Sequence, residues 1–146
     1  MPIKTFLDLE IFKLSRQLAK EIFQVTLQFP AEEKYSLTDQ IPRSSRSVKA
    51  NIAEGWGKRI YINSFKSHLV NSNGSLEETK SWCISALDCN YISEEVYTDF
   101  INKAEIIGSK LWKVHDTDRT LKRNHNLTSY FLLLTSAKYV FIPGTF

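Results

Sequence analysis

The chain has 146 residues, of which 42% are hydrophobic and 24% charged, and its formal net charge is +3. This length suits one globular domain with one core, and no stretch has the composition of a low-complexity linker. Only five glycines and four prolines occur, which favours a few long helices over many short strands. No run reaches the roughly 20 apolar residues of a membrane-spanning helix, so we expect no membrane partner.

Two features bear on cellular location. The N-terminal stretch "MPIKTFLDLEIF" has no basic leader followed by an apolar segment and a cleavage site, so we expect no secretion. Cys83 and Cys89 lie six residues apart on one predicted helix. They therefore point to different faces and cannot pair with each other. A reducing, cytoplasmic location is the prediction.

The first half of the chain predicts two helices. Apolar residues recur every three or four positions over residues 5–29, where Pro30 ends the pattern. A second helix follows with the same rhythm, and Pro42 predicts either a kink or a start near Ile41. Gly55 and Gly57 are expected to end it. Beside its apolar stripe runs a stripe of small residues that lets another backbone come close: Ser44, Ser47, Asn51 and Gly55.

The second half predicts two more helices. The third covers residues 60–90, and Gly74 in its interior suggests a close contact there, because glycine weakens a helix. Its expected inner face comprises Phe65, Leu69, Ser72, Leu76, Thr79, Cys83 and Leu87. Ser93, followed by Glu94 and Glu95, marks the start of the fourth.

These elements predict an all-α fold, an antiparallel up-down-up-down four-helix bundle over residues 1–122. Residues 123–146 form an apolar C-terminal tail that does not share the helical rhythm. The tail could pack on the bundle, add to a partner chain or hang loose. The residues alone do not decide among these.

Charge is unevenly distributed along the chain. Six basic residues and one acid, Glu54, lie between Ile41 and His68, whereas nine acids and four bases lie between Leu69 and Asp118. Such asymmetry hints at a partner surface. The alternative, that these cations are ordinary solvated surface, stays open.

Motifs for catalysis or metal binding are missing from the sequence. His68, His115 and His125 have no glutamate three residues before them, and neither CxxC nor HExxH occurs. Ser44, Ser45 and Ser47 lack an evident base. We therefore expect no catalytic residues, no metal, no cofactor and no small-molecule substrate.

The segment "GWGKR", residues 55–59, resembles a phosphate-binding loop only superficially. Such a loop follows a strand, has four residues between its glycines and ends in a lysine and a hydroxyl. We interpret the segment as a corner between helices, where Gly55 and Gly57 turn the chain and Trp56 covers the apolar core. Lys58 and Arg59 are expected to be exposed beside it and able to meet phosphates.

The stretches "YSLTDQIPRSSRSVKANIAEGWGKR", "SLEETKSW" and "NYISEEVY" resemble a known family. The chain, over about residues 6–122, is similar to the bacterial 23S rRNA intervening-sequence proteins, a group that also includes the accessory variability determinant of diversity-generating retroelements. The resemblance implies a non-enzymatic four-helix bundle that forms a homopentamer. Some relatives offer a basic surface to RNA and to a reverse transcriptase. Pro42 stands where many members carry a basic residue.

Carried over residue by residue, the resemblance implies positions for nucleic-acid contact. They are Arg43, Arg46, Lys49, Lys58 and Arg59. It also suggests that Glu54, Glu77 and Glu78 form internal polar pairs, with Arg43 or Arg46 as partners.

Two functional hypotheses follow. The first is an oligomeric bundle that binds RNA or an RNA–protein complex through cations of the second helix and its following corner. The second is a protein–protein interaction scaffold with no nucleic-acid role, whose wide apolar stripes form contacts between subunits.

Overall fold

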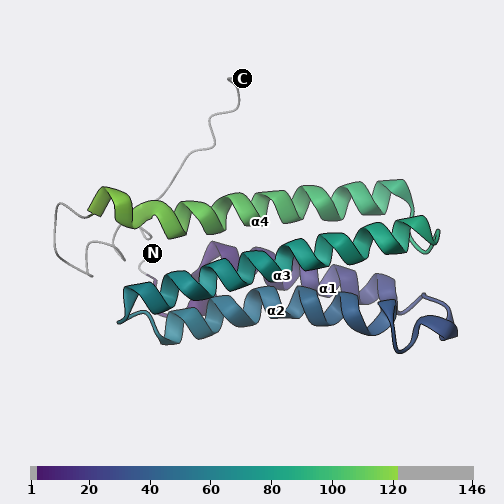
Figure 1. Cartoon of the computed structure of the whole chain (residues 1–146), viewed down its shortest axis with the longest axis horizontal. Helices are drawn as coiled ribbons and strands as arrows, with labels where there is room; N and C mark the ends of the chain where they lie inside the picture. The colour runs from purple at the N-terminus through teal and green to yellow at the C-terminus, as the bar shows by residue number, and fades with distance from the viewer. Residues whose placement is uncertain (1–2, 122–146) are drawn as a thin grey trace, which may run out of the picture.

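A computed structural model describes residues 3–121 and contains four long helices (Figure 1). The helices are α1 (Glu10–Thr26), α2 (Leu37–Gly57), α3 (Ile62–Asp88) and α4 (Glu94–Leu121), with short 3-10 turns η1 (Phe6–Asp8) and η2 (Ala31–Glu33). Each helix contacts the next along the chain, and α1 also contacts α4. This closed order confirms the predicted four-helix bundle. The predicted tail over residues 123–146 lies outside the described residues.

The apolar stripes of the helices meet in one core. Its most deeply buried large side chains include Ile22 of α1, Ile52 of α2 and Phe65 of α3. Burying a side chain of this size stabilises the fold by about 1.5–3 kcal/mol. In the part of the chain that the structure describes, no helix combines the length and the apolar character required to cross a bilayer.

The first predicted helix is interrupted near its start. Thr5 caps the short turn η1 through a reciprocal hydrogen bond with Asp8, and Leu9 is extended before α1 begins at Glu10. Backbone hydrogen bonds, chiefly from Thr5, lower the pKa of the Asp8 carboxyl. The prediction of one helix over residues 5–29 was therefore wrong at both ends, because the local cap competes with the helix at the start and α1 ends at Thr26.

Helix α2 begins earlier than predicted. It starts at Leu37 and carries Pro42 in its interior, so the expected start near Ile41 was wrong. Proline has no N–H to donate to the carbonyl of Thr38, which costs one helical hydrogen bond. Pro42 is buried, and the helix continues through it.

The predicted stripe of small residues on α2 faces α3. The Ser47 and Ser75 hydroxyls lie 2.9 Å apart, and Ser72 donates a 2.8 Å hydrogen bond to the Val48 carbonyl. Small hydroxyl side chains allow this close approach and also satisfy one another's polar groups. The prediction that this stripe admits a neighbouring backbone is confirmed, and α3 is that neighbour.

Helices α3 and α4 follow the expected pattern closely. All predicted inner-face residues of α3 are buried except Leu87, which is half-buried. Ser93 caps α4 by accepting a hydrogen bond from the Val96 amide at 3.2 Å. The expected close contact at Gly74 was wrong: a Cβ added there would meet nothing within 4 Å.

The two cysteines are both unpaired, as their spacing predicted. Cys83 is buried in the core, and this burial raises the pKa of its thiol to about 12. Cys89 is exposed just beyond the end of α3. The cytoplasmic location expected from them stays a prediction.

Candidate nucleic-acid interface

The five predicted contact residues do not form one surface. Arg46 and Lys49 line a groove between α1 and α2. Arg43 instead forms an ion pair with Asp39, one helical turn earlier, at 3.3 Å. Lys58 and Arg59 lie at the far end of α2, where it turns into α3.

The groove between α1 and α2 is strongly basic. It has a volume of about 580 Å³ and contains no acidic residue in its lining. Its cations come from two helices: Lys13, Arg16 and Lys20 from α1, and Arg46 and Lys49 from α2. Leu7, Phe12, Ala19 and Phe23 give it an apolar floor and ends.

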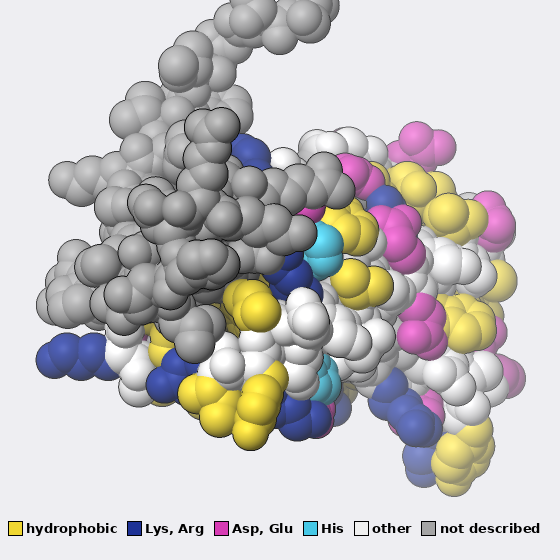
Figure 2. Space-filling view, turned by 60° about the vertical axis from the view of Figure 1, so that its left-hand side comes forward, with side chains coloured by type: hydrophobic (Ala, Val, Ile, Leu, Met, Phe, Trp, Pro, Cys, Tyr) yellow, Lys and Arg dark blue, Asp and Glu magenta, His cyan; other side chains and the backbone are white. Residues whose placement is uncertain are grey.

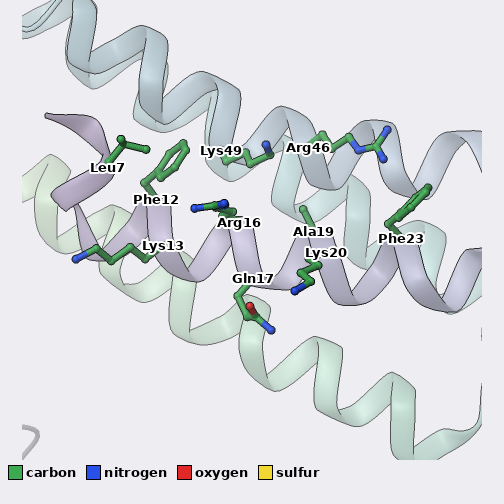
Figure 3. Close-up of a pocket in the computed structure, with 10 residues that line it drawn as sticks. All are labelled: Leu7, Phe12, Lys13, Arg16, Gln17, Ala19, Lys20, Phe23, Arg46 and Lys49. Carbon is green, nitrogen blue, oxygen red and sulfur yellow. The ribbon is translucent and has the colours of Figure 1, made fainter.

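Figure 3 shows how these side chains are arranged. Arg16 and Lys49 lie between the two helix ribbons, and Lys13 and Lys20 extend from the α1 side. Leu7 and Phe12 lie at one end of the groove, and Phe23 and Arg46 at the other. At about 1.5 Å per residue, the distance along α1 from Phe12 to Phe23 is roughly 16 Å.

Two acids of α1 pair with lysines of α4, although Lys20 lines both the groove and a second hollow that contains Glu21. Glu10 pairs with Lys110 of α4 at 3.0 Å, and Glu21 pairs with Lys103 of α4. The acidic side chains of α1 are thus held on its α4 side, away from the groove. Among residues 3–117, no ion pair involves any of the five groove cations.

Arg46 makes one specific contact inside the groove. Its guanidinium carbon lies 4.9 Å from the centre of the Phe23 ring, a cation–π arrangement. Phe23 is 36% exposed despite its size. The pair therefore presents an aromatic ring and a planar cation together at the groove's open surface.

The corner after α2 is held by contacts within the bundle. Lys58 donates to Glu54 at 2.7 Å and lies 3.1 Å from His68 Nε2. The hydrogen bond from Lys58 is the main cause of the lowered pKa of the Glu54 carboxyl. Arg59 lies 4.4 Å from the Trp56 ring centre and donates to the Trp56 carbonyl at 2.9 Å.

The corner interpretation of "GWGKR" is confirmed in part. Trp56 is buried over the core, and Gly57 is the last residue of α2. Gly55, however, does not turn the chain: it lies within α2, where a Cβ would come within 2.8 Å of the His68 Cβ. Arg59, expected to be exposed, is half-buried because it stacks on Trp56.

The suggested internal pairs of the glutamates were wrong. All three are exposed: Glu54 pairs with Lys58, Glu77 pairs with Lys80 at 3.0 Å, and Glu78 accepts a 3.2 Å hydrogen bond from the Trp82 indole. Each uses a partner three or four residues away on its own helix. Such local pairs on a helix surface contribute only a few tenths of a kcal/mol.

Sequence reasoning missed the α1 cations, although a signal was present. Lys13, Arg16 and Lys20 are spaced by three and four residues, so they share one face of a helix. What the spacing could not give was the neighbour that this face meets. The pairing of α1 with α2 places that face beside Arg46 and Lys49.

Basic and acidic side chains, which are unevenly distributed along the sequence, also lie on different parts of the folded molecule. In Figure 2, Lys and Arg side chains gather along the lower part of the molecule, which α2 forms in Figure 1, and acidic side chains lie mainly to the right. Within residues 3–117, no group of three or more His, Cys, Asp or Glu side chains is placed to hold a metal ion. The arrangement is chemically suited to binding an anion along a groove.

Comparison with known proteins identifies the family. A family model described as 23S rRNA-intervening sequence protein matches residues 7–113. A search of curated proteins gave no match. Because the match covers most of the chain, the protein belongs to the family of 23S rRNA-intervening sequence proteins.

Proposed function

We propose that this 23S rRNA-intervening sequence protein binds RNA through the α1–α2 groove, as a binding protein that performs no catalysis. The observation that carries the proposal is the set of five groove cations with no acid in the lining. The family description, which refers to rRNA, supports RNA as the polyanion.

The electrostatics of the groove favour a phosphate backbone as ligand. A cation already paired within the protein must lose that partner before it can neutralise a phosphate. Among residues 3–117 no groove cation forms an ion pair, and Lys13 alone of them contributes to a lowered carboxyl pKa, that of Asp8, whereas Arg43 and Lys58 each hold an acid. We therefore revise the contact set to Lys13, Arg16, Lys20, Arg46 and Lys49, with Arg43, Lys58 and Arg59 outside its centre.

Salt dependence of binding tests this proposal. For single-stranded RNA, log K is expected to fall with log salt with a slope of about −0.7 per phosphate neutralised, or roughly −3.5 for five cations. Fluorescence anisotropy with a labelled rRNA fragment, measured at several salt concentrations, gives the slope. The double variant Arg16→Gln/Lys49→Gln should make the slope shallower by about 1.4.

The matched control removes the same charge elsewhere. Lys34→Gln/Lys113→Gln alters two cations outside the groove and should change the slope much less. A flat salt dependence in the native protein would contradict RNA binding. If the salt slope became equally shallow in both double variants, RNA binding would depend on the net charge of the protein and not on the groove.

We also propose that copies of the chain associate with one another. The same association is what the alternative hypothesis of a protein–protein scaffold requires. Large apolar side chains remain exposed on the outer faces of two helices: Val70 and Ile84 on α3, and Ile106 and Trp112 on α4. Contacts between copies of the chain would bury them. The family resemblance suggests a homopentamer, with a reverse transcriptase as a further candidate partner.

Light scattering on the purified protein measures the mass of the assembly directly. We expect a mass about five times that of one chain, and we expect Ile106→Lys/Trp112→Lys to reduce it because buried charge opposes association. A monomer at micromolar concentration would contradict the assembly proposal. If the oligomer forms but RNA binding shows no salt dependence, the scaffold role is favoured over the RNA role.

A further inference from the structure

We infer that the groove selects single-stranded RNA, by stacking an unpaired base on the Arg46–Phe23 pair while the remaining cations hold the adjoining phosphates. This inference rests on the proposed function and names the class of RNA. The observation behind it is the juxtaposition of an exposed aromatic–guanidinium pair and a row of unpaired cations in one groove.

The Arg46–Phe23 pair has the chemistry of a base platform. Single-strand-binding proteins combine a basic groove with aromatic side chains, and bases also stack on the plane of an arginine guanidinium. Arg46 is exposed and lies over the half-exposed Phe23 ring, which holds the guanidinium in place. Phe23 lies on α1 and Arg46 on α2, so two rigid helices position the platform.

The position of the platform fits a strand running along the groove. Phe23 and Arg46 occupy one end, and Arg16 and Lys49 lie further along, between the helices (Figure 3). A strand with a base on the platform would thus pass its phosphates over these cations. The groove length of roughly 16 Å admits a few nucleotides.

A duplex cannot use the same site fully. Its bases are paired and stacked inside the helix, so only phosphates, 2′-hydroxyls and base edges reach the protein, and no base face is free to stack on the platform. An acidic peptide would meet the cations but also lacks a base. The aromatic–guanidinium pair is the feature that favours RNA over such a peptide.

The experiment separates stacking from charge. The probes are a labelled single-stranded RNA of about 12 nucleotides, an abasic strand of the same length, and a blunt-ended RNA duplex without a loop. The variants are Arg46→Lys, which keeps the charge but removes the guanidinium plane, and Phe23→Leu, which keeps an apolar side chain but removes the ring. Circular dichroism verifies that both variants remain helical.

We expect each variant to bind the single-stranded RNA about tenfold more weakly, with an unchanged salt slope. Binding of the abasic strand and of the blunt-ended duplex should change little in either variant. The native protein should prefer the RNA strand over the abasic strand by a similar factor.

Other outcomes overturn the inference. If the native protein binds the abasic strand or the blunt-ended duplex as tightly as the RNA strand, no base is stacked. If polyglutamate competes as well as RNA at equal charge, the groove is an acidic-peptide site. If the native protein shows no preference for the RNA strand, but its RNA binding weakens steeply with salt and polyglutamate competes poorly, the proposed function stands and only single-strand selection fails.

Discussion

Replacing Phe65 by alanine is expected to lower the free energy of unfolding by about 3–5 kcal/mol. Phe65 is fully buried at the start of α3, in the core shared with α2. Removing its ring forfeits the transfer free energy of the ring and leaves a cavity that the surrounding helices fill only partly. A typical domain has about 5–15 kcal/mol of stability in total, so this loss is a large fraction.

Urea or guanidinium unfolding, followed by circular dichroism, measures the change. All variants should be compared at one protein concentration, because assembly adds to apparent stability. Tyr35→Ala is the matched control: it also removes a ring, but Tyr35 is 86% exposed, so we expect a change within about 0.5 kcal/mol. A Phe65→Ala loss no larger than that of Tyr35→Ala would mean that α3 does not bury this face.

The fold could be predicted from sequence because a helical stripe is a local property. Ile22, Ile52, Phe65 and Leu76 each lie on a recurring apolar face, and all are buried. Helix ends were less predictable. At Asp8, a side chain forms a local cap that competes with the helix, and at Pro42 the helix continues although proline cannot donate the helical hydrogen bond.

The site was predictable only in part, because it joins residues from two helices. Arg46 and Lys49 were named from the family resemblance of one segment, but their partners on α1 lie about 30 residues away in sequence. Two of the other predicted contact residues could have been excluded from the candidate site by their spacing in the sequence alone. Arg43 follows Asp39 by four residues, and Lys58 follows Glu54 by four, which is the spacing of helical ion pairs.

Two glycines show most clearly that residue spacing does not reveal which positions lie against a neighbouring helix. Gly55 and Gly74 both lie inside helices, and alanine is preferred over glycine at such positions by about 1 kcal/mol. A Cβ at Gly74 would meet nothing within 4 Å, whereas one at Gly55 would lie 2.8 Å from the His68 Cβ. The sequence predicts a close contact at both positions, and only the packing of α2 on α3 shows that Gly55 has one and Gly74 does not.

We therefore expect opposite signs for the same substitution at these two positions. Gly74→Ala should raise the free energy of unfolding by up to about 1 kcal/mol, since helix propensity acts there without a clash. Gly55→Ala should lower it by about 1–2 kcal/mol, because overpacking costs more than the propensity gains. The clash involves the His68 Cβ, which is fixed to the α3 backbone and cannot rotate away.

Denaturant unfolding of both variants and of the native protein measures the sign of each change in the free energy of unfolding. Gly57→Ala is a further control, because Gly57 ends α2 with open space around it, and it should not be destabilised as Gly55→Ala is. If Gly55→Ala stabilised the protein as much as Gly74→Ala, α2 and α3 could not lie this close. The close approach at Gly55 continues the small-residue stripe that packs α2 on α3. That packing leaves the opposite flank of α2, with Arg46 and Lys49, facing the groove with α1.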